Sequence, residues 1–261
     1  METDRRSLAV AALLCLLTAT GCARADDPAD QAPHLVVEVL GTAPHDPRAF
    51  TQGLQITDGV LYESTGMPGE SGVRAVDRAT GAELAAAELP PPLFGEGIAV
   101  AGATLWQLTW KDGIAFARDP ATLAERGQVS YEGEGWGLCA RDGQLVMSDG
   151  SATLAFRDPV TFARTGSVDL NGRPSARLNE LECAADGSVY ANNWPTDEIL
   201  RIDPGTGEIL ATIDASGLLP PSERAGADVL NGITQIPGTD RFLLTGKYWP
   251  TMFEVRFVPA S

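Results

Sequence analysis

Leu93-Phe-Gly-Glu-Gly-Ile-Ala-Val100 is the stretch from which the fold is most directly predicted. In it, Glu96 stands between two glycines, directly before an apolar run that is typical of a buried strand. Glycine on both sides lets backbone or a ligand approach closely, since no side chain blocks the way. A carboxylate here is either a solvent-facing residue at the start of a strand, the commoner case for a single Glu, or a proton-transfer group in a pocket.

Similar stretches recur at four other places along the chain. All five stretches contain an apolar residue at the same aligned position, which we call the anchor. The anchors are Leu54, Ile98, Leu138, Leu181 and Ile233, and successive anchors are 44, 40, 43 and 52 residues apart. A turn and a short apolar run follow each anchor, and three of the first four turns contain Asp-Gly, a strong hairpin signal. Further short strands complete each unit. Four short strands repeated about every 40 to 50 residues are typical of propeller blades.

The repeat predicts an all-β fold, a five-bladed β-propeller over residues 35–261. The last unit has only three strands, and its fourth is expected from the N-terminal run Leu35-Val-Val-Glu-Val-Leu40. This strand would close the ring and so remove unpaired edges. The five aligned stretches would all begin innermost strands, and their side chains would converge on one place. Four of these side chains are Gln52, Glu96, Trp136 and Asn179.

Residues 1–21 have the pattern of a signal peptide and are excluded from the fold. Two arginines precede the apolar run Leu8–Leu17, which is too short for a transmembrane helix. Because Gly21-Cys22 follows, the segment resembles a bacterial lipoprotein signal, with lipidation expected at Cys22. Plain secretion after cleavage at Ala25 is the alternative.

Residues 22–34 are polar and without periodicity, so they are expected to form a tether ahead of the folded domain. We expect an exported monomer, either a cell-envelope lipoprotein or a periplasmic or secreted protein. Any membrane association would then depend on the lipid at Cys22. The formal net charge of −16 argues against nucleic acid as a partner.

The inventory of reactive side chains excludes several chemistries. The two histidines, His34 and His45, are too few for a histidine-rich zinc site, and no phosphate-binding glycine loop is present. We therefore expect no metal and no cofactor. Cys139 and Cys183 occupy equivalent places in neighbouring units, which leaves both a disulfide and two buried thiols open.

Ten stretches, taken in order, resemble the plant and bacterial type of glutaminyl cyclase, and they cover nearly all of the chain after the tether. Prominent among them are His45–Leu54, Phe94–Ile98, Gly135–Leu138, Leu178–Glu182, Val189–Trp194 and Thr245–Val255. The family is a five-bladed propeller, which agrees with the repeat. The resemblance implies conversion of the N-terminal glutamine of peptides or proteins to pyroglutamate, with loss of ammonia.

The resemblance also implies the residues of the site. Glu96 would be the acid/base residue. The residues implied to line the substrate pocket are Phe50, Gln52, Phe94, Trp110, Trp136, Asn179, Trp194 and Lys247. The chain departs from the family after Gly66, where Met-Pro-Gly-Glu replaces an expected aromatic residue and glycine, so the rim is expected to differ there.

Two other functions compete with catalysis. The first is a non-catalytic, lipid-anchored propeller that binds a peptide or a sugar, because propellers host many functions. Glu96, if amide and cationic donors face it as expected, argues against this reading, since a binding module needs no proton acceptor. The second is a metal-dependent propeller of the quinoprotein or lactone-hydrolysing kind. Its candidate ligands would be Asn179, Glu180, Glu182 and Asn231.

Overall fold

The computed structural model describes residues 32–260. The expected signal peptide, Cys22 and most of the expected tether lie outside the described residues. The last residues of that tether belong to the fold, because Ala32 is buried and His34 opens the first strand. Apart from the short 3-10 helix η2 (Pro221–Glu223), the regular elements of residues 32–260 are strands. None of the helical structure in this range is long and apolar enough to cross a membrane.

Three four-stranded antiparallel sheets follow one another along the chain, each with its strands in sequence order. The first contains β2 (Thr51–Thr57), β3 (Val60–Thr65), β4 (Gly72–Asp77) and β5 (Glu83–Glu88). The second contains β6 (Gly95–Ala101), β7 (Thr104–Thr109), β8 (Ile114–Arg118) and β9 (Glu125–Ser130). The third contains β10 (Leu138–Arg141), β11 (Gln144–Met147), β12 (Thr153–Arg157) and β13 (Arg164–Asp169).

Two of the three Asp-Gly turns expected from the sequence are two-residue hairpin turns, and they connect the first two strands of the first and third sheets; Asp186-Gly187 lies instead in the longer loop between Cys183 and Val189 of the eight-stranded sheet. Thr57 pairs with Val60 across Asp58-Gly59, and Arg141 pairs with Gln144 across Asp142-Gly143. All four turn residues have positive φ, between 43° and 80°. A two-residue hairpin turn of this kind requires positive φ at both positions, which Asp and Gly tolerate well.

The remaining strands form one eight-stranded sheet. One half contains β14 (Leu178–Cys183), β15 (Val189–Asn193), β16 (Glu198–Ile202) and β17 (Ile209–Asp214). The other half contains β1 (His34–Pro44), β20 (Thr251–Pro259), β19 (Arg241–Gly246) and β18 (Leu230–Gln235). The halves meet where β1 pairs in parallel with β17, over only three residue pairs from His34↔Thr212 to Val36↔Asp214.

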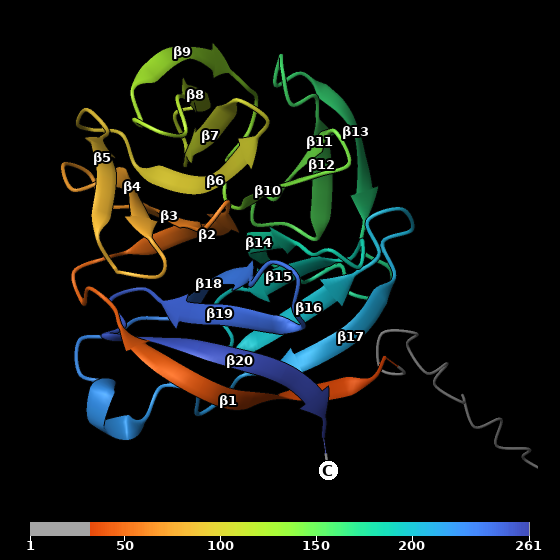
Figure 1. The fold of residues 1–261 in the computed structure, drawn as a ribbon. Helices are drawn as coiled ribbons and strands as arrows, with labels where there is room; N and C mark the ends of the chain where they lie inside the picture. Colours follow the sequence, from red (N-terminus) through yellow and green to blue (C-terminus); the bar gives the residue numbers. More distant parts are fainter. Residues whose placement is uncertain (1–31, 261) are drawn as a thin grey trace, which may run out of the picture.

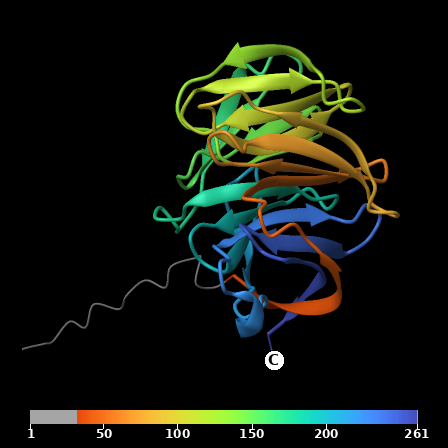
Figure 2. The same ribbon diagram turned by 90° about the vertical axis from the view of Figure 1, so that its left-hand side faces the viewer.

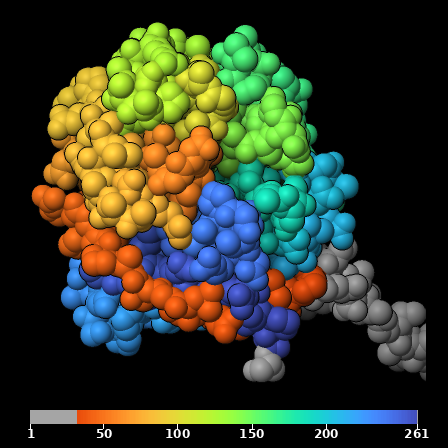
Figure 3. Space-filling model, in the orientation of Figure 1, coloured from red at the N-terminus to blue at the C-terminus, as the bar shows by residue number. Residues whose placement is uncertain are grey.

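The N-terminal strand pairs with the last strand of the chain, as the sequence predicted. β1 runs antiparallel to β20 from Leu35↔Pro259 to Pro44↔Thr251, so the pairing extends beyond the expected run at residues 35–40. Figures 1 and 3 show β1, in red to orange, lying along the blue C-terminal strand. The two ends of the described chain therefore meet in one sheet.

The first strands of the five units contact one another in a closed cycle. β2 contacts β6, β6 contacts β10, β10 contacts β14, β14 contacts β18, and β18 contacts β2. In Figure 1 these strands lie toward the centre, and the later strands of each unit lie outward. Figure 2 shows the same arrangement from the side, with strands of successive sheets above one another.

Glycines allow this close approach of the innermost strands. A Cβ at Gly97 would lie 2.6 Å from the Leu138 nitrogen, and a Cβ at Gly137 would lie 2.1 Å from the Asn179 carbonyl oxygen. In the fourth unit the equivalent position holds Glu180, which is fully buried. Its carboxylate accepts hydrogen bonds from the backbone N–H groups of Leu54 (3.0 Å) and Ile233 (2.8 Å). Glu180 thus fills the centre and ties three units together.

Apolar side chains of neighbouring sheets form the core between the units. One buried cluster joins the third and fourth units through residues such as Val146, Leu154, Leu181 and Leu200. The same two units are joined by a disulfide between Cys139 of β10 and Cys183 of β14, whose Cα atoms are 5.4 Å apart. This separation is in the usual range for a disulfide, so equivalent positions in neighbouring units are close enough for a bridge.

Candidate active site

Bulges in the innermost strands carry the polar side chains of the site. Glu96 lies between the pairs Gly95↔Thr109 and Ile98↔Gln107, where two residues of β6 face one residue of β7. The pairing of the first, fourth and fifth units shifts in the same way at Gln52, Asn179 and Asn231. A bulge bends the strand and re-aims its side chain, so the repeat directs equivalent residues toward the centre.

Glu96 is the central carboxylate of the site and is only 3% exposed. The side-chain amide of Gln52 donates a hydrogen bond to its Oε1 across 3.0 Å. The second oxygen, Oε2, is buried and accepts no hydrogen bond from any residue in the range 32–260. The carboxylate is therefore fixed through one oxygen and presents the other to a bound molecule.

Asn231 determines which way the Gln52 amide points. Asn231 Nδ2 donates to the backbone carbonyl of Thr51 (2.9 Å), and a carbonyl can only accept. The same nitrogen also donates to Gln52 Oε1 across 3.1 Å. Gln52 must then turn its NH₂ group toward Glu96. Asn231 is fully buried and occupies the fifth equivalent position of the repeat, yet sequence reasoning considered it only as a metal ligand.

Burial raises the pKa of Glu96 well above the ordinary value for a glutamate. The positive charge of Lys247 lowers this pKa, and the negative charge of Glu134 raises it. Lys247 is itself 5% exposed, and burial lowers its pKa, while the charges of Glu96 and Asp228 raise it. The site thus holds a carboxyl group that accepts a proton more readily than a solvent-exposed glutamate does.

A series of neighbouring rings surrounds the site, and we call it the aromatic arc: Tyr248, Phe50, Phe94, Trp110, Trp136 and Trp194. Its first half runs from the last unit to the second. Lys247 Nζ lies 4.6 Å from the ring centroid of Phe50. The Phe50 ring is 5.1 Å from Tyr248 and 5.9 Å from Phe94, both edge to face. Phe94, two residues before Glu96, lies 5.5 Å from Trp110. Apart from Tyr248, these are predicted pocket residues, and the structure brings them together.

Glu134 joins this first half of the arc to the second half, which consists of Trp136 in the third unit and Trp194 in the fourth. Its Oε2 accepts hydrogen bonds from the indole N–H of Trp110 (2.7 Å) and of Trp136 (3.0 Å). The Trp136 ring in turn contacts the Trp194 ring edge to face at 5.8 Å. The backbone carbonyl of Trp136 accepts a hydrogen bond from Gly97, the residue after Glu96. The arc therefore surrounds the position of the carboxylate.

Asn179, the last predicted pocket residue, lies on β14 beside the third unit. Its backbone carbonyl accepts a hydrogen bond from Ser148 (2.6 Å), and its side-chain Oδ1 is buried without a hydrogen bond from residues 32–260. Across this described range, no group of three or more His, Cys, Asp or Glu side chains is placed to hold a metal ion. Of the metal-ligand candidates, Glu180 spends both oxygens on backbone N–H groups.

This architecture and site can be compared with those of known proteins. Residues 8–257 match the family model described as glutamine cyclotransferase. The chain belongs to the glutamine cyclotransferase family. A relative in this family, the glutaminyl-peptide cyclotransferase of Arabidopsis thaliana, is 39% identical over 233 residues, which cover 86% of this chain and 72% of the relative. The crystal structure of Myxococcus xanthus glutaminyl cyclase is similar with a TM-score of 0.80 and 38% identity, over 88% of this chain and all of that chain.

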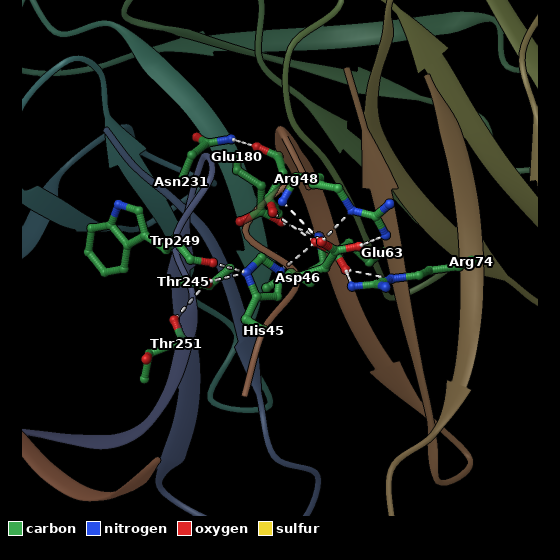
Figure 4. Close-up of polar contacts among 12 residues, drawn as sticks. His45, Asp46, Arg48, Glu63, Arg74, Glu180, Asn231, Thr245, Trp249 and Thr251 are labelled. Atoms are coloured by element: carbon green, nitrogen blue, oxygen red, sulfur yellow. Dashed lines mark hydrogen bonds and ion pairs between the residues drawn. The ribbon is translucent and has the colours of Figure 1, made fainter. Parts of the chain in front are cut away.

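In this member of the glutamine cyclotransferase family, His45 and Glu63 form a buried ion pair (Figure 4). His45 Nε2 lies 2.8 Å from Glu63 Oε1, and His45 Nδ1 lies 2.6 Å from the Trp249 carbonyl oxygen. Burial opposes ionisation of Glu63, but its bonds to His45, Arg74 and Thr51 outweigh burial and lower its pKa to about 2. The β1–β2 segment is thereby fastened to the β19–β20 turn.

Proposed function

We propose that this family member is a glutaminyl-peptide cyclotransferase in which Glu96 transfers the proton. Its substrates are peptides or proteins with an N-terminal glutamine, and its products are the pyroglutamyl peptide and ammonia. The observation that carries this proposal is the buried Glu96 carboxylate, held by Gln52 through one oxygen and unbonded within residues 32–260 at the other. The family membership and the aromatic arc around this carboxylate support it.

The reaction needs one group that first takes a proton and later returns it. The substrate α-amine attacks the Cδ carbon of its own glutamine side chain, forming the ring C–N bond, and Glu96 Oε2 takes a proton from the attacking nitrogen. The tetrahedral oxyanion collapses, the bond from Cδ to the side-chain nitrogen breaks, and Glu96 returns the proton to that nitrogen. Ammonia leaves, and Glu96 is ionised again.

The surrounding side chains account for the remaining demands of the reaction. Because the reaction is intramolecular, the pocket must hold the glutamine side chain in a folded rotamer, a task that fits the rings of Phe94, Trp110 and Trp136. Hydrogen-bond donors and positive charge stabilise the developing oxyanion. The candidates for these roles are the buried Lys247, which carries positive charge, and the buried Asn179, whose amide can donate. The raised pKa of Glu96 brings proton acceptance and return closer to balance near neutral pH.

The five-bladed β-propeller remains our proposal for the architecture. The closed cycle of contacts among β2, β6, β10, β14 and β18 supports it. In this description the eight-stranded sheet is two blades that touch through the short parallel contact of β1 with β17. β1 would be the fourth strand of the last blade.

We also propose that the protein is exported as a monomer, with a signal peptide over residues 1–21 and lipid attachment at Cys22. The residues that support this are the Arg5-Arg6 pair, the apolar run after it and Gly21-Cys22. The tether and lipid would keep the catalytic domain at the cell envelope, and secretion without a lipid is the alternative. Radiolabelled palmitate incorporated by the wild-type chain, but not after Cys22→Ala, would distinguish the two.

The decisive experiment measures ammonia release and product mass with a glutamine-initiated peptide. The expected result is stoichiometric ammonia and a peptide lighter by one ammonia molecule. The same peptide acetylated on its α-amine should give neither, because acylation removes the nucleophile. Binding of the free peptide without turnover would favour the non-catalytic alternative and overturn the proposal.

A further inference from the structure

The aromatic arc ends at an exposed arginine, Arg177, directly before β14. Its guanidinium lies over the ring of Trp194, with 4.1 Å between Cζ and the ring centroid, and 5.4 Å from the ring centroid of Trp136. Arginine stacks well on aromatic faces because its charged plane is weakly hydrated. Arg177 was not among the residues that the sequence predicted for the site.

The backbone holds Arg177 beside this ring. Its carbonyl accepts a hydrogen bond from the Trp194 N–H (2.9 Å), and its own N–H donates to Asn193 Oδ1 (3.0 Å). Arg177 and Trp194 are therefore neighbours across the start of the β14–β15 pair. This pairing places the two side chains next to each other, and the guanidinium stacks on the Trp194 ring.

The charge of Arg177 is available to a ligand. Within the range 32–260, no carboxylate lies within ion-pair distance of it, although the chain is strongly acidic overall. Of the other cations near the arc, Lys111 lies 3.8 Å from Glu134, Arg173 lies 2.7 Å from Glu198, and Lys247 is buried beside Phe50. Stacking occupies one face of the guanidinium and leaves the N–H groups in its plane free to donate, an arrangement that suits a planar carboxylate.

A bound peptide has to leave the site past the arc. Glu180, Gln52 and Asn231 fill the centre below Glu96 with buried side chains. Trp136 connects Glu96 with the end of the arc at Trp194. Its backbone carbonyl accepts a hydrogen bond from Gly97, the residue after Glu96, and its ring contacts the Trp194 ring. The Trp194 ring centroid lies 5.8 Å from that of Trp136 and 4.1 Å from Arg177 Cζ, and about three residues of an extended peptide, at about 3.5 Å each, cover the two spans together.

We propose that Arg177 binds a carboxylate that closely follows the N-terminal glutamine of the substrate, and so selects acidic over neutral and basic peptides. The carboxylate is either an acidic side chain at the second position or the chain terminus of a very short peptide. This inference rests on the proposed cyclotransferase activity and adds a determinant of its specificity.

The test compares kcat/KM for matched substrates, measured by ammonia release. Gln-Glu amide against Gln-Gln amide isolates a side-chain carboxylate, and Gln-Ala against Gln-Ala amide isolates a terminal one. For the wild-type chain we expect the carboxylate form to be favoured up to about five-fold, the scale of an exposed ion pair, and less so at high salt. In Arg177→Gln the ratio should fall toward one, and Arg177→Lys should retain part of it.

Arg164→Gln is the matched control, because Arg164 is an exposed arginine on the outer strand β13 and its loss changes the net charge equally. It should keep the wild-type ratio. An Arg177 that only covers Trp194 would lower kcat/KM for both members of a pair alike and leave their ratio unchanged, which contradicts the proposal. If no glutamine peptide releases ammonia, the cyclotransferase proposal fails and this inference with it; normal turnover with unchanged ratios overturns the inference alone.

Discussion

Gln52 Nε2 lies 3.0 Å from Glu96 Oε1, and this hydrogen bond joins the innermost strands of the first two units at the centre of the site. It assigns different tasks to the two carboxylate oxygens, since Oε1 is held and Oε2 faces the substrate. The geometry requires Gln52 to donate, and Asn231 enforces that orientation. A surface glutamate at the start of a strand would have neither partner nor burial, so the proton-transfer interpretation is favoured.

The Glu96→Gln substitution tests this interpretation directly. It preserves the shape of the side chain but removes the base, so kcat on a glutamine peptide should fall by about 10²- to 10⁴-fold. KM should change little if Glu96 acts mainly in the transition state. Glu83→Gln, on the exposed outer strand β5, is the matched control and should keep wild-type turnover. Near-normal kcat in Glu96→Gln would move the catalytic role to another carboxylate.

The charge of Lys247 should affect how kcat/KM depends on pH. Burial raises the pKa of Glu96, and Lys247 opposes that increase. Glu96 must be ionised to accept the amine proton, so kcat/KM should fall with acidification at a pH well above the ordinary glutamate value of about 4.3. In Lys247→Met this acidic limb should move to higher pH. A limb that stays in place or moves to lower pH would mean that another group controls it.

Asn231→Asp should disturb the same profile through Gln52. An ionised aspartate cannot donate, so the Gln52 amide is expected to turn its NH₂ group toward residue 231 and its oxygen toward Glu96. An acceptor facing Glu96 favours the protonated carboxyl, and a second negative charge nearby does the same. The acidic limb of kcat/KM should therefore move to higher pH. Asn231→Ser, which can still donate one hydrogen bond, should shift it less.

Local sequence signals predicted the strands and the alignment of the units. Asp58-Gly59 and Asp142-Gly143 form the expected hairpin turns because both residues tolerate positive φ. The repeat placed Glu96 and Gln52 at equivalent positions, and their contact follows from the closed cycle of innermost strands.

Contacts between side chains of different units left no comparable signal. Glu134 bonds two indoles that lie 24 residues before it and 2 residues after it, and nothing in its neighbouring residues distinguishes it from a surface glutamate. The pairing of His45 with Glu63 depends on how β1 returns to the last strand, which the sequence predicted only as strand pairing. The disulfide depended on a Cα separation that the sequence left open.

Removal of the first part of β1 should destabilise the fold. A chain that begins at Gly41 lacks the pairs from Leu35↔Pro259 to Val39↔Val255, which exposes the edge of β20, whereas one that begins at His34 retains them. The chain that begins at Gly41 also loses Leu35 and Val37, which pack against the core of the last unit. We expect the free energy of unfolding to fall by about 2 kcal/mol or more. Equal melting temperatures for these two chains would contradict the structural role of β1.

The buried pair of His45 and Glu63 should make stability depend on pH. Both ring nitrogens of His45 face oxygen acceptors, so the doubly protonated imidazolium satisfies them best. Burial lowers the pKa of His45, but the bonds and charge of Glu63 outweigh it, so the folded-state pKa is raised above the ordinary value. A raised pKa contributes stability that is fully present below the unfolded-state pKa of about 6.5 and is lost as the pH rises through the folded-state pKa.

His45→Gln should therefore lower the free energy of unfolding most at about pH 5.5 to 6.5, by roughly 1.5–3 kcal/mol, the scale of hydrogen bonds to charged groups. The difference from wild type should shrink as the pH rises above this window and through the raised folded-state pKa. Urea unfolding across this range measures both chains, and Arg48→Gln is the control. Arg48 is 88% exposed in its pair with Asp46, so its loss should cost under about 0.5 kcal/mol without a trend in this range. A His45→Gln penalty that stays constant with pH would mean that folding does not shift the pKa of His45, and a penalty that grows with pH would mean that His45 is neutral in the folded protein.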